Sequence, residues 1–289
     1  SPFLLAVGAA LFIWAWVRAG SLSVMLQNPP VGPSPHQPVG NVFGAGLTSA
    51  VAFWGTMALS IPDFSRYAKS QRDQLVGQAV GLPATMAVFA FIGAAVTNST
   101  VVIFGTRVAD PVALLARIGG PLMIMLSMAG LAVATLTTNI AANIVAPANA
   151  FSNLAPDKIR FKQGAMITAV IGILMMPWRL YNDAAAYIFT WLIGYGALLG
   201  PVAGIMIADY FFVRRGELVL NDLYTRRGAY EYFRGVNWIA IGALALGVAP
   251  SLPGFVSALR GVPEQGVFGT IYNWAWFAGF FIAGVAYCV

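Results

Sequence analysis

Long apolar runs, separated by short clusters of charged residues, divide the chain. Each run is continuous rather than alternating, which is typical of helices in lipid and not of half-exposed strands. A helix that crosses a bilayer needs about 20 predominantly apolar residues. The pattern therefore predicts an all-helical integral membrane protein with eight spans, at approximately residues 3–18, 42–62, 76–105, 121–150, 163–180, 186–208, 235–256 and 268–289.

Three of these runs have unusual lengths. The 33 uncharged residues of 74–106 exceed one straight span, which predicts a tilted helix or an extra turn. The 39 uncharged residues of 118–156 must include a connection. The run 163–180 is short, and Pro177 near its end predicts a kink or a stop.

Composition supports the membrane assignment and excludes several classes of protein. The chain is 59% hydrophobic and only 9% charged, which is too few charges for the surface of a soluble enzyme or a nucleic-acid binder. It has one cysteine, Cys288, and one histidine, His36. One cysteine cannot form an internal disulfide, and one histidine with one cysteine cannot supply a zinc site or a histidine-based triad. We therefore expect a protein that is not an enzyme and has no organic cofactor.

The basic residues predict how the chain crosses the membrane. Eleven of the 16 lysines and arginines lie in alternate loops, at 63–75, 151–163 and 209–235. The positive-inside rule places these three loops in the cytoplasm of a multi-pass protein of the plasma or inner membrane. Because the chain begins at Ser1 and ends within an apolar run, we expect it to be a fragment of a longer protein.

A face of small and hydroxylated residues on the fourth span is a candidate cation site. Ala134, Thr137 and Thr138 fall within roughly 100° of one another at 3.6 residues per turn. Hydroxyl and carbonyl oxygens suit a small hard cation. Threonines and small residues also join membrane helices, so packing is the alternative interpretation at this point.

Two further features are candidate sites. Trp54 lies well inside the second span, away from the membrane interface that tryptophan usually occupies, and its ring could stack on a planar ligand. Glycines at 44, 46 and 55 predict that this helix is broken, as in transporter binding sites. Gly196, Gly200 and Gly204, spaced by four, predict a seam of close helix packing.

The acidic residues bear on the coupling ion. Asp63 and Asp209 fall at predicted cytoplasmic ends of helices, and none of the ten acidic residues falls in mid-membrane. A carboxylate proton relay is therefore not indicated in this segment, and a neutral, oxygen-rich site favours Na⁺ over H⁺.

Several long motifs resemble those of the nucleobase–cation symporter-1 family, which includes allantoin, hydantoin, uracil and uridine permeases. They occur in order and with the family's spacing over most of residues 42–240. They are SIPDFSRYAKSQRDQLVGQAVGLP (60–83), ATLTTNIAANIVAPANAFSN (134–153), MMPWRL (175–180), GPVAGIMIADYFFVRRGELVLNDLY (200–224) and YEYFRGVNW (230–238).

The resemblance implies the five-plus-five inverted-repeat fold of sodium-coupled amino-acid transporters, usually with twelve helices. Residues 1–289 would then form one transmembrane transporter domain that is truncated at its N-terminus and holds helices 5 to 12. The implied function is import of a small planar nucleobase-like or ureide substrate by cation symport. The expected partners are that substrate and the lipid bilayer, with no nucleic acid and no obligate protein partner.

The resemblance also implies which residues contact the substrate. Trp54 corresponds to a tryptophan that stacks on the substrate ring. Its neighbour Phe53 replaces a glycine of the hydantoin permease and would reshape the pocket. Asn143 corresponds to an asparagine that hydrogen-bonds the polar edge of the substrate, and Leu192 to a gating leucine.

For the cation, the resemblance implies Na⁺ held by the carbonyl of Ala134 and the hydroxyls of Thr137 and Thr138. One alternative is a proton-coupled nucleobase or nucleoside permease of the same family. A more distant alternative is a channel or a non-transporting membrane receptor. The sequence leaves open the exact substrate, the stoichiometry and the oligomeric state.

Overall fold

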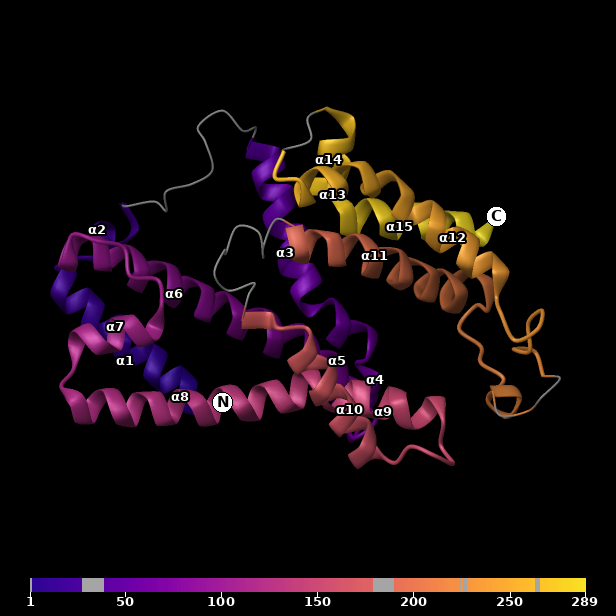
Figure 1. Cartoon of the computed structure of the whole chain (residues 1–289), viewed down its shortest axis with the longest axis horizontal. Coiled ribbons are helices and arrows are strands. Elements are labelled where there is room, and N and C mark those ends of the chain that lie inside the picture. The colour runs from indigo at the N-terminus through magenta and orange to yellow at the C-terminus, as the bar shows by residue number, and fades with distance from the viewer. Residues whose placement is uncertain (1, 28–38, 179–189, 224, 226–227, 263–265) are drawn as a thin grey trace. The chain divides into compact units, whose positions relative to one another are not determined.

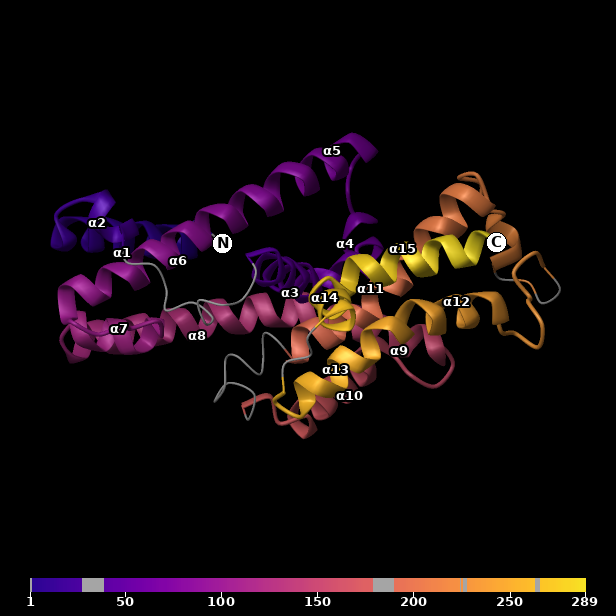
Figure 2. The same ribbon diagram turned by 90° about the horizontal axis from the view of Figure 1, so that it is seen from above.

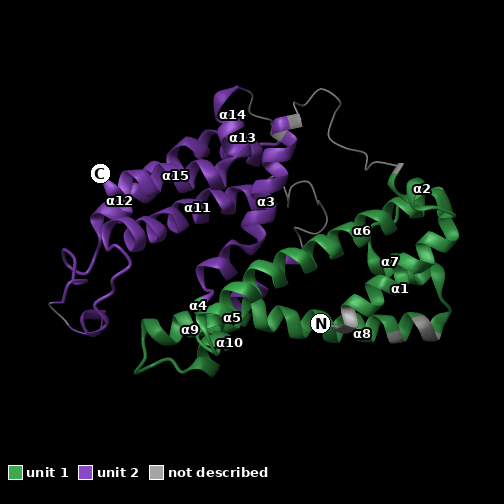
Figure 3. Ribbon diagram, turned by 180° about the vertical axis from the view of Figure 1, so that it is seen from behind, with its two compact units in different colours: residues 1–33, 62–169 green, residues 34–61, 170–289 purple. Residues whose placement is uncertain are grey.

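The computed structural model describes residues 2–27, 39–178, 190–223, 225, 228–262 and 266–289. It divides into two compact units (Figure 3). Unit 1 comprises residues 1–33 and 62–169, and unit 2 comprises residues 34–61 and 170–289. Each unit is described by itself below.

Unit 1 contains most of the helices from the first half of the chain (Figure 1). Its helices are α1 (Pro2–Ala19), α2 (Leu22–Gln27), α4 (Pro62–Ser65), α5 (Gln71–Val76), η1 (Gly77–Gly81), α6 (Leu82–Phe104), α7 (Pro111–Ile118), α8 (Pro121–Asn143), α9 (Val145–Leu154) and α10 (Phe161–Leu174), the last of which crosses the boundary between the units.

The long uncharged run after residue 70 forms one continuous helical segment of 34 residues, Gln71–Phe104. The Ser70 hydroxyl accepts the N–H of Asp73 at 3.1 Å and so caps its beginning. Gly105 ends it in the left-handed conformation, at φ 69°. At about 1.5 Å per residue this segment is longer than the bilayer core, as its sequence predicts.

Unit 2 contains the remaining elements, among which α11, α12 and α15 lie side by side (Figures 1 and 2). They are α3 (Val39–Leu59), α11 (Ile193–Ile207), η4 (Ala208–Val213), η5 (Leu220–Leu223), α12 (Trp238–Val248), η6 (Ala249–Ser251), α13 (Leu252–Leu259), α14 (Val267–Asn273) and α15 (Ala275–Cys288). The segments α14 and α15 form one apolar pair bent by 93°.

All eight predicted spans contain helix in the part of the chain that is described. Five helices there are long and apolar enough to cross a membrane, and the bent pair makes a sixth. Two shorter apolar helices lie at Leu5–Ala19 and Phe161–Leu174. The run 121–150 breaks at Ile144, and the run 163–180 ends as helix at Leu174, before Pro177. The predicted stop is confirmed, whereas Ser127–Leu154 counts as one membrane-length helical segment in spite of the break at Ile144.

The glycine seam on α11 brings two helices into backbone contact, as its spacing predicts. A Cβ added at Gly200 would fall on the backbone carbonyl of Trp276, and one at Gly204 on that of Phe280. Both glycines are buried, and the two residues that they meet are one turn apart on α15. The seam is therefore the closest part of the α11–α15 packing, and side chains larger than hydrogen have no space there.

We expect Gly200→Leu to prevent α11 and α15 from packing and to reduce strongly the yield of folded protein. Overpacking a well-packed site typically costs about 1–3 kcal/mol, and here the obstacle is backbone rather than a flexible side chain. Gly242→Leu on α12 is the matched control, because nothing lies within 4 Å of a Cβ added there. Size-exclusion profiles and thermal unfolding of the two detergent-solubilised variants make the comparison. Equal stability of both variants would contradict the role of the seam.

Candidate functional site

The predicted cation ligands lie on one helix, α8, in unit 1. The helix has Pro121 in its first turn, where a missing N–H is tolerated because that turn has no intrahelical acceptor for it. Ala134 is buried, with 7% of its surface exposed, whereas Thr137 and Thr138 are exposed. Exposed hydroxyls on an apolar helix are unfavourable against lipid, so this face is suited to protein, water or a ligand.

The Thr137 hydroxyl makes two hydrogen bonds within α8. It donates to the carbonyl of Val133 at 2.9 Å and to that of Ala134 at 3.0 Å. This donation leaves the lone pairs of the hydroxyl oxygen free to accept a cation. The Ala134 carbonyl oxygen and the Thr137 hydroxyl oxygen are therefore close enough to share one ion. Thr138 makes no side-chain hydrogen bond to any residue that is described.

Asn143 ends α8 and does not join the threonine face. Its side-chain amide donates to the Oδ1 atom of Asn139, one turn earlier, and both side chains are exposed. On a straight helix Asn143 lies about 140° from Thr138. The helix breaks only after Asn143, at Ile144, so the break does not bring the two side chains together.

Trp54 and Phe53 lie on α3, in unit 2. The small residues Ala45, Ala52 and Gly55 are buried on one face of this helix, and a Cβ added at Gly55 would lie 2.8 Å from Leu199 of α11. Trp54 lies roughly opposite that face and is half-buried. Phe53 is 55% exposed, and its ring meets the indole edge to face at a centroid distance of 5.4 Å. Phe53 is therefore open to a ligand, whereas Trp54 presents only part of its indole.

The prediction that α3 is broken is wrong. The helix is continuous from Val39 to Leu59. Gly44 and Gly55 instead allow close approach, because an added Cβ would meet the ring of Trp274 or the side chain of Leu199. Nothing lies within 4 Å of a Cβ at Gly46. Glycine on this helix thus serves packing rather than unwinding.

Leu192 lies in unit 2 at the start of α11. It is buried, at 8% exposed, and residues 190–192, which lead into the helix, are π-helical. Such π segments frequently mark functional positions in helices. Leu192, Phe53 and Trp54 thus share one unit, and the predicted cation ligands and Asn143 share the other.

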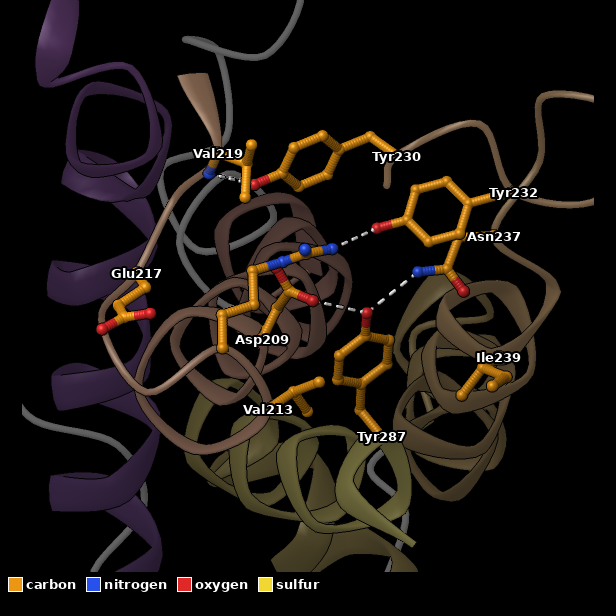
Figure 4. Close-up of a pocket in the computed structure, with 10 residues that line it drawn as sticks. Asp209, Val213, Glu217, Val219, Tyr230, Tyr232, Asn237, Ile239 and Tyr287 are labelled. Carbon is orange, nitrogen blue, oxygen red and sulfur yellow. Dashed lines mark hydrogen bonds and ion pairs between the residues drawn. The ribbon is translucent and has the colours of Figure 1, made fainter. Parts of the chain in front are cut away.

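A cavity of about 460 Å³ opens in unit 2 where η4, α12 and α15 meet the segment that joins η4 to α12 (Figure 4). Arg214 donates from Nε to Asp209 at 2.6 Å and from a terminal nitrogen to the Tyr232 hydroxyl at 2.7 Å. The Tyr287 hydroxyl donates to Asp209 at 2.8 Å. The cavity is lined by Asp209, Val213, Arg214, Glu217, Val219, Tyr230, Tyr232, Asn237, Ile239 and Tyr287.

The polar groups of this cavity mostly satisfy one another. Asn237 donates to the Tyr287 hydroxyl at 2.9 Å, and the Arg214 guanidinium lies over the Tyr230 ring at 4.3 Å. Burial lowers the pKa of Arg214, but the hydrogen bond and the charge of Asp209 outweigh it and raise that pKa. We interpret this network as a structural one that links η4 to the end of α15 and the start of α12, rather than as a transport site.

The sequence predicts Asp209 at a helix end, but the helix continues past it as η4, to Val213, and the network was not predicted. Tyr287 lies 78 residues from Asp209 in the sequence, and Tyr232 lies 18 from Arg214. The one local signal is YEYFRGVN, a segment rich in aromatic and hydrogen-bonding residues directly before α12. Asp63, the other helix-end acid, pairs with Arg66 at 2.6 Å and accepts from Asn149 at 2.9 Å.

Comparison with known proteins identifies the family. Residues 1–279 match the family described as "Permease for cytosine/purines, uracil, thiamine, allantoin". The chain is 44% identical over its whole length to the purine-uracil permease NCS1 of Arabidopsis thaliana, covering 48% of that protein. It is 43% identical to the allantoin permease of Bacillus subtilis, over 86% of this chain and 49% of the relative. The chain thus spans about half the length of these relatives.

A solved structure supports the same family. Mhp1, a nucleobase-cation-symport-1 family transporter in a closed conformation with bromovinylhydantoin bound, matches the whole chain with a TM-score of 0.72 at 29% identity, over 59% of that protein. The all-helical, five-plus-five inverted-repeat fold expected from the sequence is confirmed by this match. The chain is a multi-pass membrane protein, and it belongs to the nucleobase–cation symporter-1 family of cytosine/purine, uracil, thiamine and allantoin permeases.

Proposed function

We propose that the chain is the C-terminal portion, helices 5 to 12 of twelve, of a secondary transporter that imports a small planar nucleobase-like or ureide compound. The observation that carries this proposal is the identity of 43% and 44% to permeases named for allantoin and for purines and uracil. These substrates share a flat, nitrogen-rich ring or ureide with hydrogen-bonding edges. A further relative is a hydantoin permease, 33% identical over 87% of this chain.

The substrate stacks on Trp54 and hydrogen-bonds to Asn143. The half-buried indole provides a flat apolar face, and such stacking of a base on an aromatic ring is worth about 1–3 kcal/mol. The Asn143 amide offers both a donor and an acceptor, which matches the alternating groups of a ureide or a pyrimidine. Phe53 narrows the space beside Trp54, and Leu192 closes over the substrate as a gate.

The co-transported ion is Na⁺, bound by the Ala134 carbonyl and the hydroxyls of Thr137 and Thr138. The 3.0 Å separation of the Ala134 and Thr137 oxygens supports shared coordination. Thr137 can keep its hydrogen bond to Val133 while the Ala134 carbonyl turns to the ion. Neutral oxygen ligands also agree with the absence, in the described part of the chain, of any group of three or more His, Cys, Asp or Glu residues that could hold a metal.

Competition for uptake tests the substrate class. The full-length parent protein is expressed in cells that lack related permeases, and uptake of radiolabelled allantoin is measured with unlabelled uracil, hydantoin, uridine or cytosine present. We expect one ring class to compete while amino acids and sugars do not. Saturable uptake that no planar nitrogen compound inhibits would overturn the substrate assignment. Flux that follows only the substrate gradient would favour a channel, and binding without flux would favour a receptor.

A further inference from the structure

The bent pair α14–α15 in unit 2 breaks in the middle of an apolar run that contains neither proline nor glycine at the break. The two helices meet at 93° around Asn273 and Trp274. Sharp bends normally have an identifiable cause, such as proline, a glycine pair, a π-bulge or an inserted polar group. Here other helices of the same unit make contacts at the bend.

The first of these contacts comes from α3, the helix that carries Trp54. A helix break frees backbone carbonyls that lipid cannot satisfy. The Thr48 hydroxyl, which is fully buried, donates to the freed carbonyl of Asn273 at 2.7 Å. One turn earlier on α3, Gly44 lies so close to the Trp274 ring that a Cβ added there would lie 2.5 Å from it. The bend thus packs on α3 through the Thr48–Asn273 hydrogen bond and the close approach of Gly44 to the Trp274 ring.

The second contact reaches the start of α11, where Leu192 lies. The Tyr272 hydroxyl donates to the carbonyl of Thr190 at 3.1 Å, across 82 residues of sequence. Thr190 is π-helical, as are the two residues after it, so this hydrogen bond falls on an irregular part of the chain directly before α11. Tyr272 is 5% exposed and packs in one cluster with Ile193, the residue after Leu192.

We propose that Tyr272 and Thr48 are positioning residues, through which the bent pair α14–α15 holds the Leu192 segment in a fixed place relative to α3. This inference rests on the proposed function, in which Trp54 stacks on the substrate and Leu192 gates it. Neither Tyr272 nor Thr48 contacts the substrate in that proposal. Each acts by satisfying a backbone carbonyl at an irregular point of a membrane helix. Loss of the Tyr272 hydrogen bond frees the start of α11 to open.

Cysteine accessibility at position 192 tests the inference without transport. In the full-length protein carrying Cys288→Ser and Leu192→Cys, the rate of maleimide labelling reports how often the buried segment opens. We expect Tyr272→Phe to raise that rate roughly 3- to 10-fold, the effect of losing its neutral hydrogen bond to Thr190. Tyr195→Phe, one turn further along α11, is the matched control, because Tyr195 makes no side-chain hydrogen bond to the described residues and should leave the rate unchanged.

Hydrogen exchange of residues 190–197 in the otherwise unaltered protein gives a second reading if Leu192→Cys fails to fold. Faster exchange in Tyr272→Phe and in Thr48→Val, but not in Tyr195→Phe, supports the inference. Unchanged labelling and unchanged exchange overturn it, whatever the protein transports.

Kinetics separate positioning from a merely structural role. We expect Tyr272→Phe to raise KM severalfold, because an unsteady gate releases substrate, while the amount of folded protein in the membrane stays constant. A KM equal to that of wild type together with faster labelling would overturn the link to gating. Absence of transport by the wild-type protein itself would instead refute the proposed function and leave the labelling result intact.

Discussion

Trp54→Ala in the full-length protein is expected to weaken substrate binding by roughly 10- to 100-fold. Stacking of a planar ring on an aromatic side chain is worth about 1–3 kcal/mol, and each 1.4 kcal/mol is about tenfold in affinity. The indole lies roughly opposite the face of α3 that packs on α11, so its removal leaves the α3–α11 contact at Gly55 and Leu199 in place. Equilibrium binding of radiolabelled substrate to purified protein measures the loss directly.

Two variants make this result specific to stacking. Trp54→Phe keeps a flat apolar ring and should retain affinity within severalfold of wild type. Trp238→Ala removes an indole that is 60% exposed at the start of α12, and it should bind as wild type does. Equal affinity of Trp54→Ala and wild type would show that this tryptophan does not contact the substrate.

Replacing both Thr137 and Thr138 by valine is expected to abolish the dependence of uptake on Na⁺. Valine keeps the shape and β-branching of threonine but removes the hydroxyl oxygen, so two of the three proposed ligands on α8 are lost. Because coupling between two ligands is reciprocal, substrate affinity in saturating Na⁺ should also fall, by about 5- to 150-fold for typical coupling energies. Binding titrations of Na⁺ at fixed substrate, and of substrate at fixed Na⁺, measure both losses.

Thr135→Val is the control for this pair, since it removes a hydroxyl from the same helix outside the face formed by Ala134, Thr137 and Thr138. It should leave both titrations unchanged. If the double variant keeps the Na⁺ dependence of wild type, the cation assignment on α8 is wrong.

The positions of the helices could be predicted because apolar runs of sufficient length have no other stable form in lipid. Their irregularities were only partly predictable. The end of α10 before Pro177 could be predicted from the sequence, since proline cannot continue a helix. The bend at Asn273 and Trp274 has no such local signal, and the residues that contact it, Thr48 and Gly44, lie more than 200 residues away in the sequence.

The candidate site likewise has some features that the local sequence predicts and others that depend on distant residues. Helical spacing alone places Ala134, Thr137 and Thr138 on one face, and the 3.0 Å distance between two of their oxygens follows from local helix geometry. The prediction of a broken α3 was wrong because glycine permits close packing as well as unwinding, and only the partner Leu199 decides which applies. Long-range hydrogen bonds, such as that of Tyr272 to Thr190, cannot be inferred from either segment alone.

Accumulation of radiolabelled allantoin in vesicles that contain the full-length protein tests the central claim most directly. Vesicles are loaded with K⁺ and diluted into Na⁺ or K⁺ buffer at equal pH inside and outside. The proposal predicts accumulation above the external concentration with an inward Na⁺ gradient, and its collapse when K⁺ replaces Na⁺. Accumulation that ignores Na⁺ and follows an imposed pH gradient would contradict Na⁺ symport and transfer the coupling to protons.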